Sequence, residues 1–307
     1  MKKAFTLIEL IFVIVLLSII SMFGADLYVK IYNSYTNNRA TSDLEGETER
    51  TLNIITSLLR DRVKQTVIGR ETDNGEHPDG NFVSLYEVQE KHDVLEWIGK
   101  STETQYIGST KGLLGWSGFA IDSSVPSGDF VIQSPGSSLK DANNILTSLN
   151  ADTKSFGIIF NDGEVDANSF GYNKTNNHTN IGTVKITSDD TMQISGLASR
   201  NKNRYFLVHT AYAIVPVRDE NAAKVSAANK VKSNTYNLLL YYDFQPWEGE
   251  KYNNKDGKSV VLAKNVTMFR FAYDNNSVAV KLCMRDNNRN FDAEKLDFIV
   301  CKSQVVE

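Results

Sequence analysis

The sequence predicts an α+β fold in which a long N-terminal helix, made of a transmembrane part and an amphipathic stalk, packs on a β-rich, mainly antiparallel C-terminal head. Three observations predict this fold. Residues 5–24 form an almost uncharged apolar run, residues 25–68 carry apolar side chains at helical spacing, and residues 69–307 hold short alternating segments between turn residues. About 240 of the residues therefore remain for a head that is large enough to bury its own core.

The apolar run Phe5–Gly24 has about the 20 residues that a helix needs to cross the hydrocarbon of a membrane. Lys2 and Lys3 precede it and acidic residues dominate after it, which predicts a single-pass protein with its N-terminus inside. Glu9 is the only charged residue in the run, and a carboxylate that sits deep and unpaired costs about 2.5 kcal/mol or more. An ordinary secretory signal is the alternative, but residues 21–25 form a poor cleavage site and such a signal has no use for Glu9.

The start of the chain carries a motif that gives Glu9 a purpose. The stretch Ala4-Phe5-Thr6-Leu7-Ile8-Glu9-Leu10 resembles the prepilin signal of type IV pilins and type II secretion pseudopilins, in which a membrane peptidase cuts before the Phe, methylates the new amino group and leaves Glu as the fifth mature residue. The resemblance is confined to the apolar N-terminal part of the chain. It implies a leader at residues 1–4, processing between Ala4 and Phe5, and an assembly role for Glu9. The family normally has Gly where this chain has Ala4, so we expect cleavage to persist at a lower rate.

In the pilin family the glutamate meets the N-terminal amine of a neighbouring subunit inside the bilayer, where the exclusion of water strengthens the pairing. Glu9 would then favour one axial offset between subunits. The alternative is that Glu9 only snorkels to the lipid headgroups. The resemblance also implies an inner-membrane protein with a periplasmic head that enters a filament. Its partners would be other pilins or pseudopilins, the prepilin peptidase, the inner-membrane assembly platform, and secreted cargo or DNA.

The stalk, residues 25–68, contains no Pro and a single Gly, Gly46. Its apolar residues recur mostly at steps of three and four, as on one face of a helix. They are Leu44, Leu52, Ile55, Leu58, Leu59, Val63 and Val67. This face predicts the spine on which a sheet packs. Gly46 marks a zone where the helix could bend or melt.

The head contains many short segments with strand character, separated by residues that favour turns. They are Phe82–Val88, Gly118–Ile121, Asp129–Gln133, Phe156–Phe160, Gly182–Thr187, Arg204–Val217, Thr235–Tyr242, Val260–Ala263, Val266–Tyr273, Val278–Cys283 and Leu296–Cys301. The region between about residues 100 and 200 is rich in Gly, Ser, Thr and Asn, which predicts long surface loops. The last strands resemble the C-terminal sheet of the larger minor pilins and J-type minor pseudopilins, and this favours that subtype.

The two cysteines, Cys283 and Cys301, lie near the C-terminus and away from any metal-binding spacing. In a chain whose start enters a membrane, such a pair favours a structural disulfide that flanks a hairpin, with two buried free thiols as the alternative. Closing a loop of that size would stabilise the head by about 3 kcal/mol. The arrangement also resembles the C-terminal disulfide region of many type IV pilins.

The loop between the cysteines has oxygen-bearing side chains at spacings typical of a calcium loop. The candidate Ca²⁺ ligands are Asp286, Asn288, Asn290, Asp292 and Asp297. An EF-hand needs Gly where this chain has Phe291, a bidentate Glu in place of Asp297, and flanking helices rather than strands. A plain polar hairpin loop is therefore the alternative, and no other cofactor is indicated.

Signals for catalysis or nucleic-acid binding are weak, so we expect no enzyme. The 33 Lys and Arg against 37 Asp and Glu give a net charge of −4, and the basic residues are scattered. Ser137 and Ser199 each begin an S-x-x-K match without its companion motifs, and Ser117 sits in a near miss of the nucleophile elbow. The four histidines stand singly.

The sequence thus predicts a minor pilin or pseudopilin subunit that joins a type IV pilus, type II secretion or DNA-uptake filament. The large head favours a minor subunit, because a bulky head would crowd a helical shaft. The alternative is a membrane-anchored periplasmic binding or sensor domain that does not polymerise.

Overall fold

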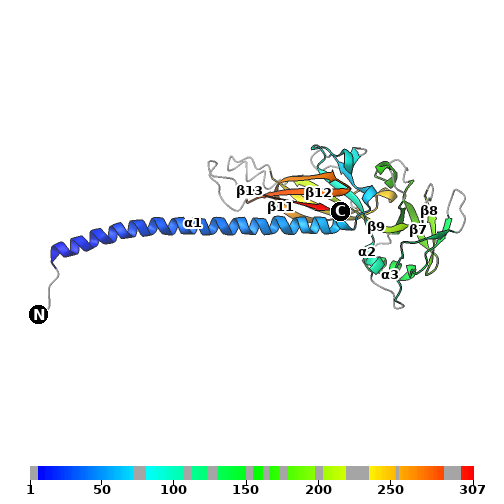
Figure 1. Ribbon diagram of the computed structural model, residues 1–307, viewed down its shortest axis with the longest axis horizontal. Helices are drawn as coiled ribbons and strands as arrows, with labels where there is room; N and C mark the ends of the chain where they lie inside the picture. Colours follow the sequence, from blue (N-terminus) through cyan, green and yellow to red (C-terminus); the bar gives the residue numbers. More distant parts are fainter. Residues whose placement is uncertain are drawn as a thin grey trace.

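The computed structural model describes residues 6–71, 81–106, 112–122, 130–149, 155–161, 166–172, 179–197, 203–218, 235–253, 256–286 and 299–307. It confirms the α+β fold: one long helix extends from an antiparallel β-rich head that packs on its C-terminal part (Figure 1). The helices are α1 (Leu7–Arg60), α2 (Thr102–Tyr106) and α3 (Leu139–Leu149). Short 3₁₀ turns are η1 (Lys64–Thr66), η2 (Leu85–Glu87), η3 (Ala167–Phe170) and η4 (Pro246–Glu248).

The strands of the described residues pair into one continuous antiparallel sheet. They are β1 (Ile68–Arg70), β2 (Phe82–Ser84), β3 (Val94–Lys100), β4 (Ile121–Asp122), β5 (Phe130–Gln133), β6 (Phe156–Phe160), β7 (Gly182–Ile186), β8 (Thr191–Ser195), β9 (Tyr205–Arg218), β10 (Tyr236–Phe244), β11 (Lys258–Asp274), β12 (Ser277–Arg285) and β13 (Ile299–Val306).

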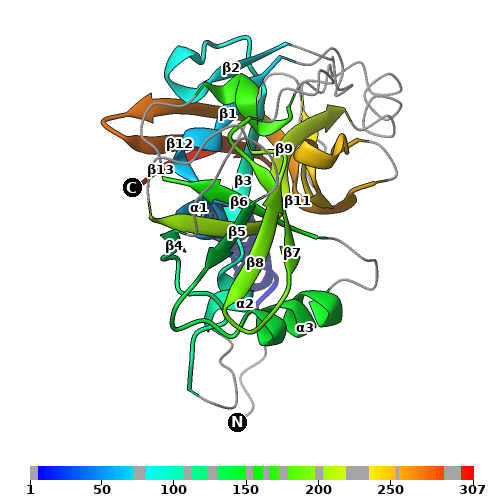
Figure 2. The same ribbon diagram turned by 90° about the vertical axis from the view of Figure 1, so that its right-hand side faces the viewer.

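The sheet forms two lobes that share the long strand β9 (Figures 1 and 2). In the lobe beside α1, the strand order is β13-β12-β11-β10-β9, and β3, β1 and β2 continue from the other edge of β9. In the distal lobe, the beginning of β9 pairs with β6, and β7, β8, β5 and β4 follow outward, with α2 and α3 beside them. The distal lobe thus lies at the end of the molecule farthest from the N-terminus (Figure 1).

Helix α1 reaches the head only in its last third. Leu44 is its first buried residue, and Leu52, Ile55 and Leu59 are fully buried in the core formed with β9–β13. On β12 the alternate residues of the α1-facing side are buried and Lys281 between them is exposed, as expected for a half-covered strand. Burial of this stripe, rather than helix propensity, therefore fixes where the head sits on α1.

The expected stalk boundary at Ile68 is wrong by eight residues, because α1 ends at Arg60. Beyond it the backbone bonds to β3 instead of to the preceding helical turn. The Val63 amide donates to the Ile98 carbonyl at 2.9 Å, and the Lys100 amide donates to the Asp61 carbonyl at 2.8 Å. Val63 and Val67 continue the apolar period past Arg60, and both are buried. They lie on either side of η1, however, and not in α1. At Gly46, where bending was expected, α1 stays helical.

Several predicted strands differ from those observed. The segments 260–263 and 266–273 form one strand, β11, with a register shift between Val266 and Met268. Residues 82–88 split into β2 and η2, and the last strand, β13, continues to Val306, five residues beyond the predicted end at Cys301. Strands β3 and β8 and helix α3 were not predicted.

Candidate functional site on the long helix

The first turn of α1 contains the residue that stood out in the sequence. Thr6 is the N-cap, and its side-chain oxygen accepts a hydrogen bond from the Glu9 amide at 3.4 Å. The Glu9 carboxylate accepts in return from the Thr6 amide at 3.4 Å and from the Thr6 hydroxyl at 3.2 Å. This reciprocal capping box satisfies free amide groups and places a negative charge at the positive end of the helix dipole. Glu9 therefore has a local role that the sequence analysis missed, although Thr-x-x-Glu before an apolar run is its signal.

The segment Leu7–Tyr35 of α1 is exposed along its whole length, about 43 Å of helix. It projects away from the head as a free rod (Figure 1). Among the described residues, α1 is the one helix that is long and apolar enough to cross a membrane. An exposed apolar surface of this size requires lipid or another protein to cover it. Ala4 and Phe5, the predicted processing site, lie outside the described residues.

Three exposed tyrosines follow the apolar run on one face of α1. Tyr28, Tyr32 and Tyr35 are 70%, 57% and 61% exposed, and the rings of Tyr28 and Tyr32 stack with centroids 6.4 Å apart. Four residues further along the same face, the Arg39 guanidinium lies 3.8 Å from the Asp43 carboxylate. The spacing of three and four keeps all of these side chains on one stripe of the helix.

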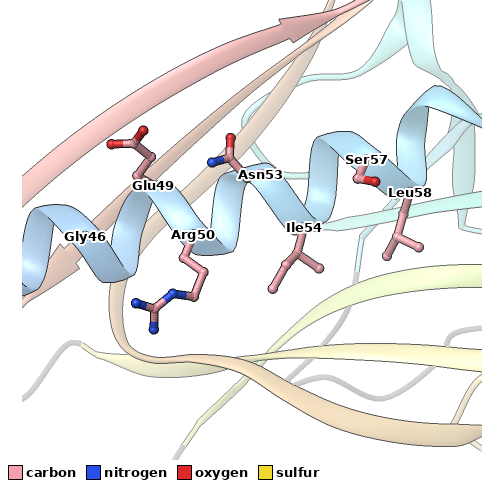
Figure 3. Close-up of a pocket in the computed structure, with 7 residues that line it drawn as sticks. All are labelled: Gly46, Glu49, Arg50, Asn53, Ile54, Ser57 and Leu58. Carbon is pink, nitrogen blue, oxygen red and sulfur yellow. The ribbon is translucent and has the colours of Figure 1, made fainter.

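A hollow of about 610 Å³ lies further along α1 (Figure 3). In the figure Arg50 and Ile54 point to one side of the helix and Asn53 to the other, and the short residues Gly46 and Ser57 leave the space open. Arg50 and Ile54 are exposed, whereas Glu49 and Asn53 contact Lys302 and Gln304 of β13, so the hollow reaches from the free face of α1 to the edge of the head. Sequence reasoning did not find this hollow because it depends on which face the head covers.

Polar contacts fasten the C-terminal part of α1 to β13. Lys302 lies 2.6 Å from the Glu49 carboxylate, and this ammonium lowers the pKa of Glu49. The Gln304 side chain donates to Asn53 at 2.9 Å and accepts from the Thr56 hydroxyl at 3.0 Å. The edge strand of the sheet is thereby tied to the helix that carries the apolar rod.

The buried Arg62 fixes the end of both elements. Its guanidinium donates to the carbonyl oxygens of Leu59 at 2.7 Å, Val306 at 3.1 Å and Glu307 at 3.1 Å. Burial lowers the pKa of Arg62. The arginine thus closes the C-terminus of α1, where cations are favoured, and holds the last residues of β13 against it.

The disulfide between Cys283 and Cys301 is confirmed. The two residues face each other across β12 and β13, so the bond closes the predicted hairpin. Of the five candidate Ca²⁺ ligands, Asp286 is described and follows β12 directly. The other four, Asn288, Asn290, Asp292 and Asp297, lie outside the described residues. Within the described ranges, no three His, Cys, Asp or Glu side chains gather as a metal site would require.

The serine and histidine candidates that the structure describes are bonded inside the head. Ser137 Oγ lies 2.7 Å from Ser134 Oγ, which in turn lies 2.5 Å from the Tyr205 hydroxyl, and all three residues are buried. Sequence reasoning missed a contact between Ser101 Oγ and His209 Nδ1 at 2.8 Å. Ser101 is also fully buried, so this hydroxyl has no open approach for a substrate. Ser199 lies outside the described residues.

Comparisons of the chain with protein-family models, with curated proteins and with solved structures find no match. The motif at the start of the chain and the geometry of α1 are therefore the features that point to a function.

Proposed function

We propose that this chain is a pilin-like or pseudopilin-like subunit of the large-headed, minor kind, which enters a filament after cleavage before Phe5. The observation that carries the proposal is the exposed apolar helix Leu7–Gly24, in which Glu9, in the first turn, is the only charged residue. A lipid anchor alone needs no carboxylate at that depth. A helix that packs among identical helices can use one, provided that a cation on the neighbour meets it.

The cation in this proposal is the amine that cleavage frees on Phe5. Within one chain the Glu9 carboxylate is already engaged by Thr6 through neutral donors, which leaves its charge uncompensated. In a bilayer an uncompensated charge is costly, and pairing it with an amine of an adjacent subunit removes much of that cost. Contact at any other offset leaves both charges buried and unpaired, so the pair selects one axial position.

The head supports a role at the surface of a filament. It is fastened to α1 from Leu44 onward, on one side of the helix only, and leaves the other side free for neighbours. Its distal lobe is held farthest from the membrane-spanning end, where it can present a surface to other subunits, to secreted cargo or to DNA (Figure 1). The disulfide suits a head on the oxidising side of the membrane.

The capping box supports a second candidate, a membrane-anchored extracytoplasmic binding or sensor domain that does not polymerise. In that case Glu9 only starts the helix, and its charge needs no neighbour. The filament function needs the negative charge of Glu9, whereas the anchored domain needs only a side chain at residue 9 that accepts hydrogen bonds from Thr6.

Two substitutions at Glu9 separate these functions. Glu9→Gln keeps an oxygen that accepts from Thr6 but removes the charge, whereas Glu9→Leu removes both. We expect both variants to insert in the membrane and both to be lost from sheared filament fractions prepared from cells with the assembly machinery. Normal incorporation of Glu9→Gln, with or without a defect in Glu9→Leu, would contradict the charge-pairing proposal and favour the anchored domain.

A further inference from the structure

Strand β13 is the outermost strand at one end of the sheet. Within the described part of the chain it pairs with β12 on one side, and no described strand pairs with its other side. It is eight residues long, Ile299–Val306, and its register with β12 has no shift. The strand at the opposite end of the same lobe, β2, has only three residues. The lobe beside α1 thus has one long and regular edge among the residues that the structure describes.

The two cysteines show which backbone groups point toward the open side of β13. In an antiparallel pair, residues that exchange hydrogen bonds have Cα atoms about 5.5 Å apart, and residues that do not exchange them lie about 4.5 Å apart. The Cα atoms of Cys283 and Cys301 are 4.0 Å apart, and the Cys283 carbonyl accepts from the Thr267 hydroxyl on β11 at 3.2 Å. Cys301 therefore belongs to a pair of the second kind, and its N–H and C=O groups point away from β12.

The same orientation recurs along the strand. Residues two apart on a strand point the same way, so Ile299, Ser303 and Val305 also turn their N–H and C=O groups away from β12. Their side chains stand on the face of the sheet opposite α1, where Ile299 is 47% and Val305 is 59% exposed. Among the described residues, no loop or turn backbone bonds the N–H and C=O groups of these positions. An open row of alternating donors and acceptors is what another β-strand pairs with.

Strand β13 is held in place although it lies at an edge. Lys302 lies 2.6 Å from the Glu49 carboxylate, Gln304 donates to Asn53 at 2.9 Å, and the Arg62 guanidinium bonds the last carbonyl groups. A strand that is already ordered loses little conformational entropy when it pairs. Edges that avoid pairing carry a Pro, a bulge or an outward charge. Strand β13 has no Pro and no bulge, and its one charged residue, Lys302, turns toward α1.

We propose that the open edge of β13 receives an extended strand of a different protein subunit, which continues the sheet by one strand. The proposal rests on the proposed filament function, since it names how the head meets a neighbour. Main-chain hydrogen bonds supply the binding and alternate side chains supply the selectivity in contacts of this kind. Ile299 and Val305 favour a partner strand with apolar or β-branched side chains on the face opposite α1.

A second copy of this chain does not fit as the occupant. Strand β13 and α1 run in the same direction, because Lys302 contacts Glu49 and, further along both elements, Val306 contacts Arg62 (Figure 1). Antiparallel pairing of two β13 strands would therefore point the two α1 helices in opposite directions, and both could not enter one membrane in the same orientation. Pairing of β13 with the three-residue β2 of another copy would leave most of the edge open.

Amide hydrogen exchange, resolved to single residues by mass spectrometry, tests the pairing directly. The full chain is compared after extraction from membranes of cells with and without the assembly machinery. The outward amides of Cys301, Ser303 and Val305 should exchange about tenfold more slowly when the machinery is present. The amides of Lys302 and Gln304 point toward β12 and should change little. Equal exchange of the outward amides in the two samples would overturn the proposal.

Two substitutions at Ser303 separate backbone pairing from side-chain contact. Ser303→Pro removes an outward N–H, which edge strands tolerate, so the Tm should stay within about 2 °C of the wild type. Ser303→Ala keeps the N–H and serves as the control. The slow exchange of Cys301 and Val305 should persist in Ser303→Ala and disappear in Ser303→Pro. Slow exchange in both variants would contradict strand pairing, and if Ser303→Pro lowers the Tm, the wild-type comparison decides.

The filament proposal is checked separately in the same cells. The wild-type chain should appear in sheared filament fractions. Its absence from them would remove the filament proposal and the strand contact together. Its presence there without slow exchange of the outward amides would contradict only the strand contact at β13.

Discussion

Removing the disulfide by the paired substitution Cys283→Ser and Cys301→Ser should destabilise the head without changing its fold. The bond joins residues that are 18 apart in sequence. In the chain-entropy treatment a loop of that length removes about 10–11 cal/mol/K from the unfolded chain, or about 3 kcal/mol at 25 °C. For a head of this size that corresponds to a fall in Tm of about 6–12 °C.

The assay is thermal unfolding of the full chain in detergent, followed by circular dichroism, with and without a reductant. Reduction should bring the Tm of the wild-type protein down to that of the paired variant and should leave the variant itself unchanged. The edge strand β13 should also exchange its amide hydrogens faster, because β13 is held to β12 at that point. A Tm that stays within about 2 °C of the wild type would refute the loop-closure reasoning.

Three further substitutions test how the head is held together. Arg62→Met removes the donor to three carbonyl oxygens and should lower the free energy of unfolding by about 3 kcal/mol in denaturant. The exposed neighbour serves as the control, and Arg60→Met should change that free energy by less than about 0.5 kcal/mol. Similar values for the two variants would contradict the role of Arg62 in holding α1 to β13. Arg70 and Glu96 form a buried ion pair with a distance of 2.9 Å, so Glu96→Leu alone should lower the free energy of unfolding by about 3–5 kcal/mol. Adding Arg70→Met should recover most of this loss, because no buried charge is then left unpaired. Losses that simply add in the double variant would contradict this pairing. Gly171 has a φ of +88°, and a Cβ at this position would lie 2.6 Å from a backbone carbon of Trp247. Gly171→Ala should therefore lower the free energy of unfolding by about 1–3 kcal/mol. An unchanged urea midpoint would show that this turn can relax.

The long helix and the general fold class could be predicted from the sequence because their signals are local. Twenty apolar residues require a helix in lipid, and the period from Leu44 to Leu59 marks the face that the head covers. The end of α1 could not be predicted, since Val63 and Val67 keep the apolar period although the Val63 amide already bonds to β3 and the Val67 carbonyl accepts from the Leu85 amide of η2. Tertiary hydrogen bonds, rather than periodicity, decide that boundary.

The missed elements in the head have different reasons. Helix α3 buries Leu139, Ala142 and Leu146 at steps of three and four, and the Ser138 hydroxyl bonds Asp141 at its start, so its signal was present but lay in a region rich in loop-forming residues. Strand β3 is buried on both faces and therefore lacks the alternation that marks a half-exposed strand.

Some features of the candidate site on α1 could be predicted from the sequence and others could not. Glu9 could be singled out because a charge in an apolar run is conspicuous in sequence, and Thr6 at the N-cap was recognisable in principle from the Thr-x-x-Glu spacing. The exposed tyrosines Tyr28, Tyr32 and Tyr35 are visible in the sequence as residues three and four apart. The hollow on α1 is not, because its seven lining residues share no motif in the sequence.

The most direct test of the central claim is the intact mass of the protein after extraction from membranes that contain active prepilin peptidase. Processing as a pilin-type subunit predicts a chain that begins at Phe5, without residues 1–4 and with one added methyl group on its amine. A full-length chain with an unmodified Met1 under those conditions would contradict the account, because the amine that Glu9 is proposed to meet would not exist.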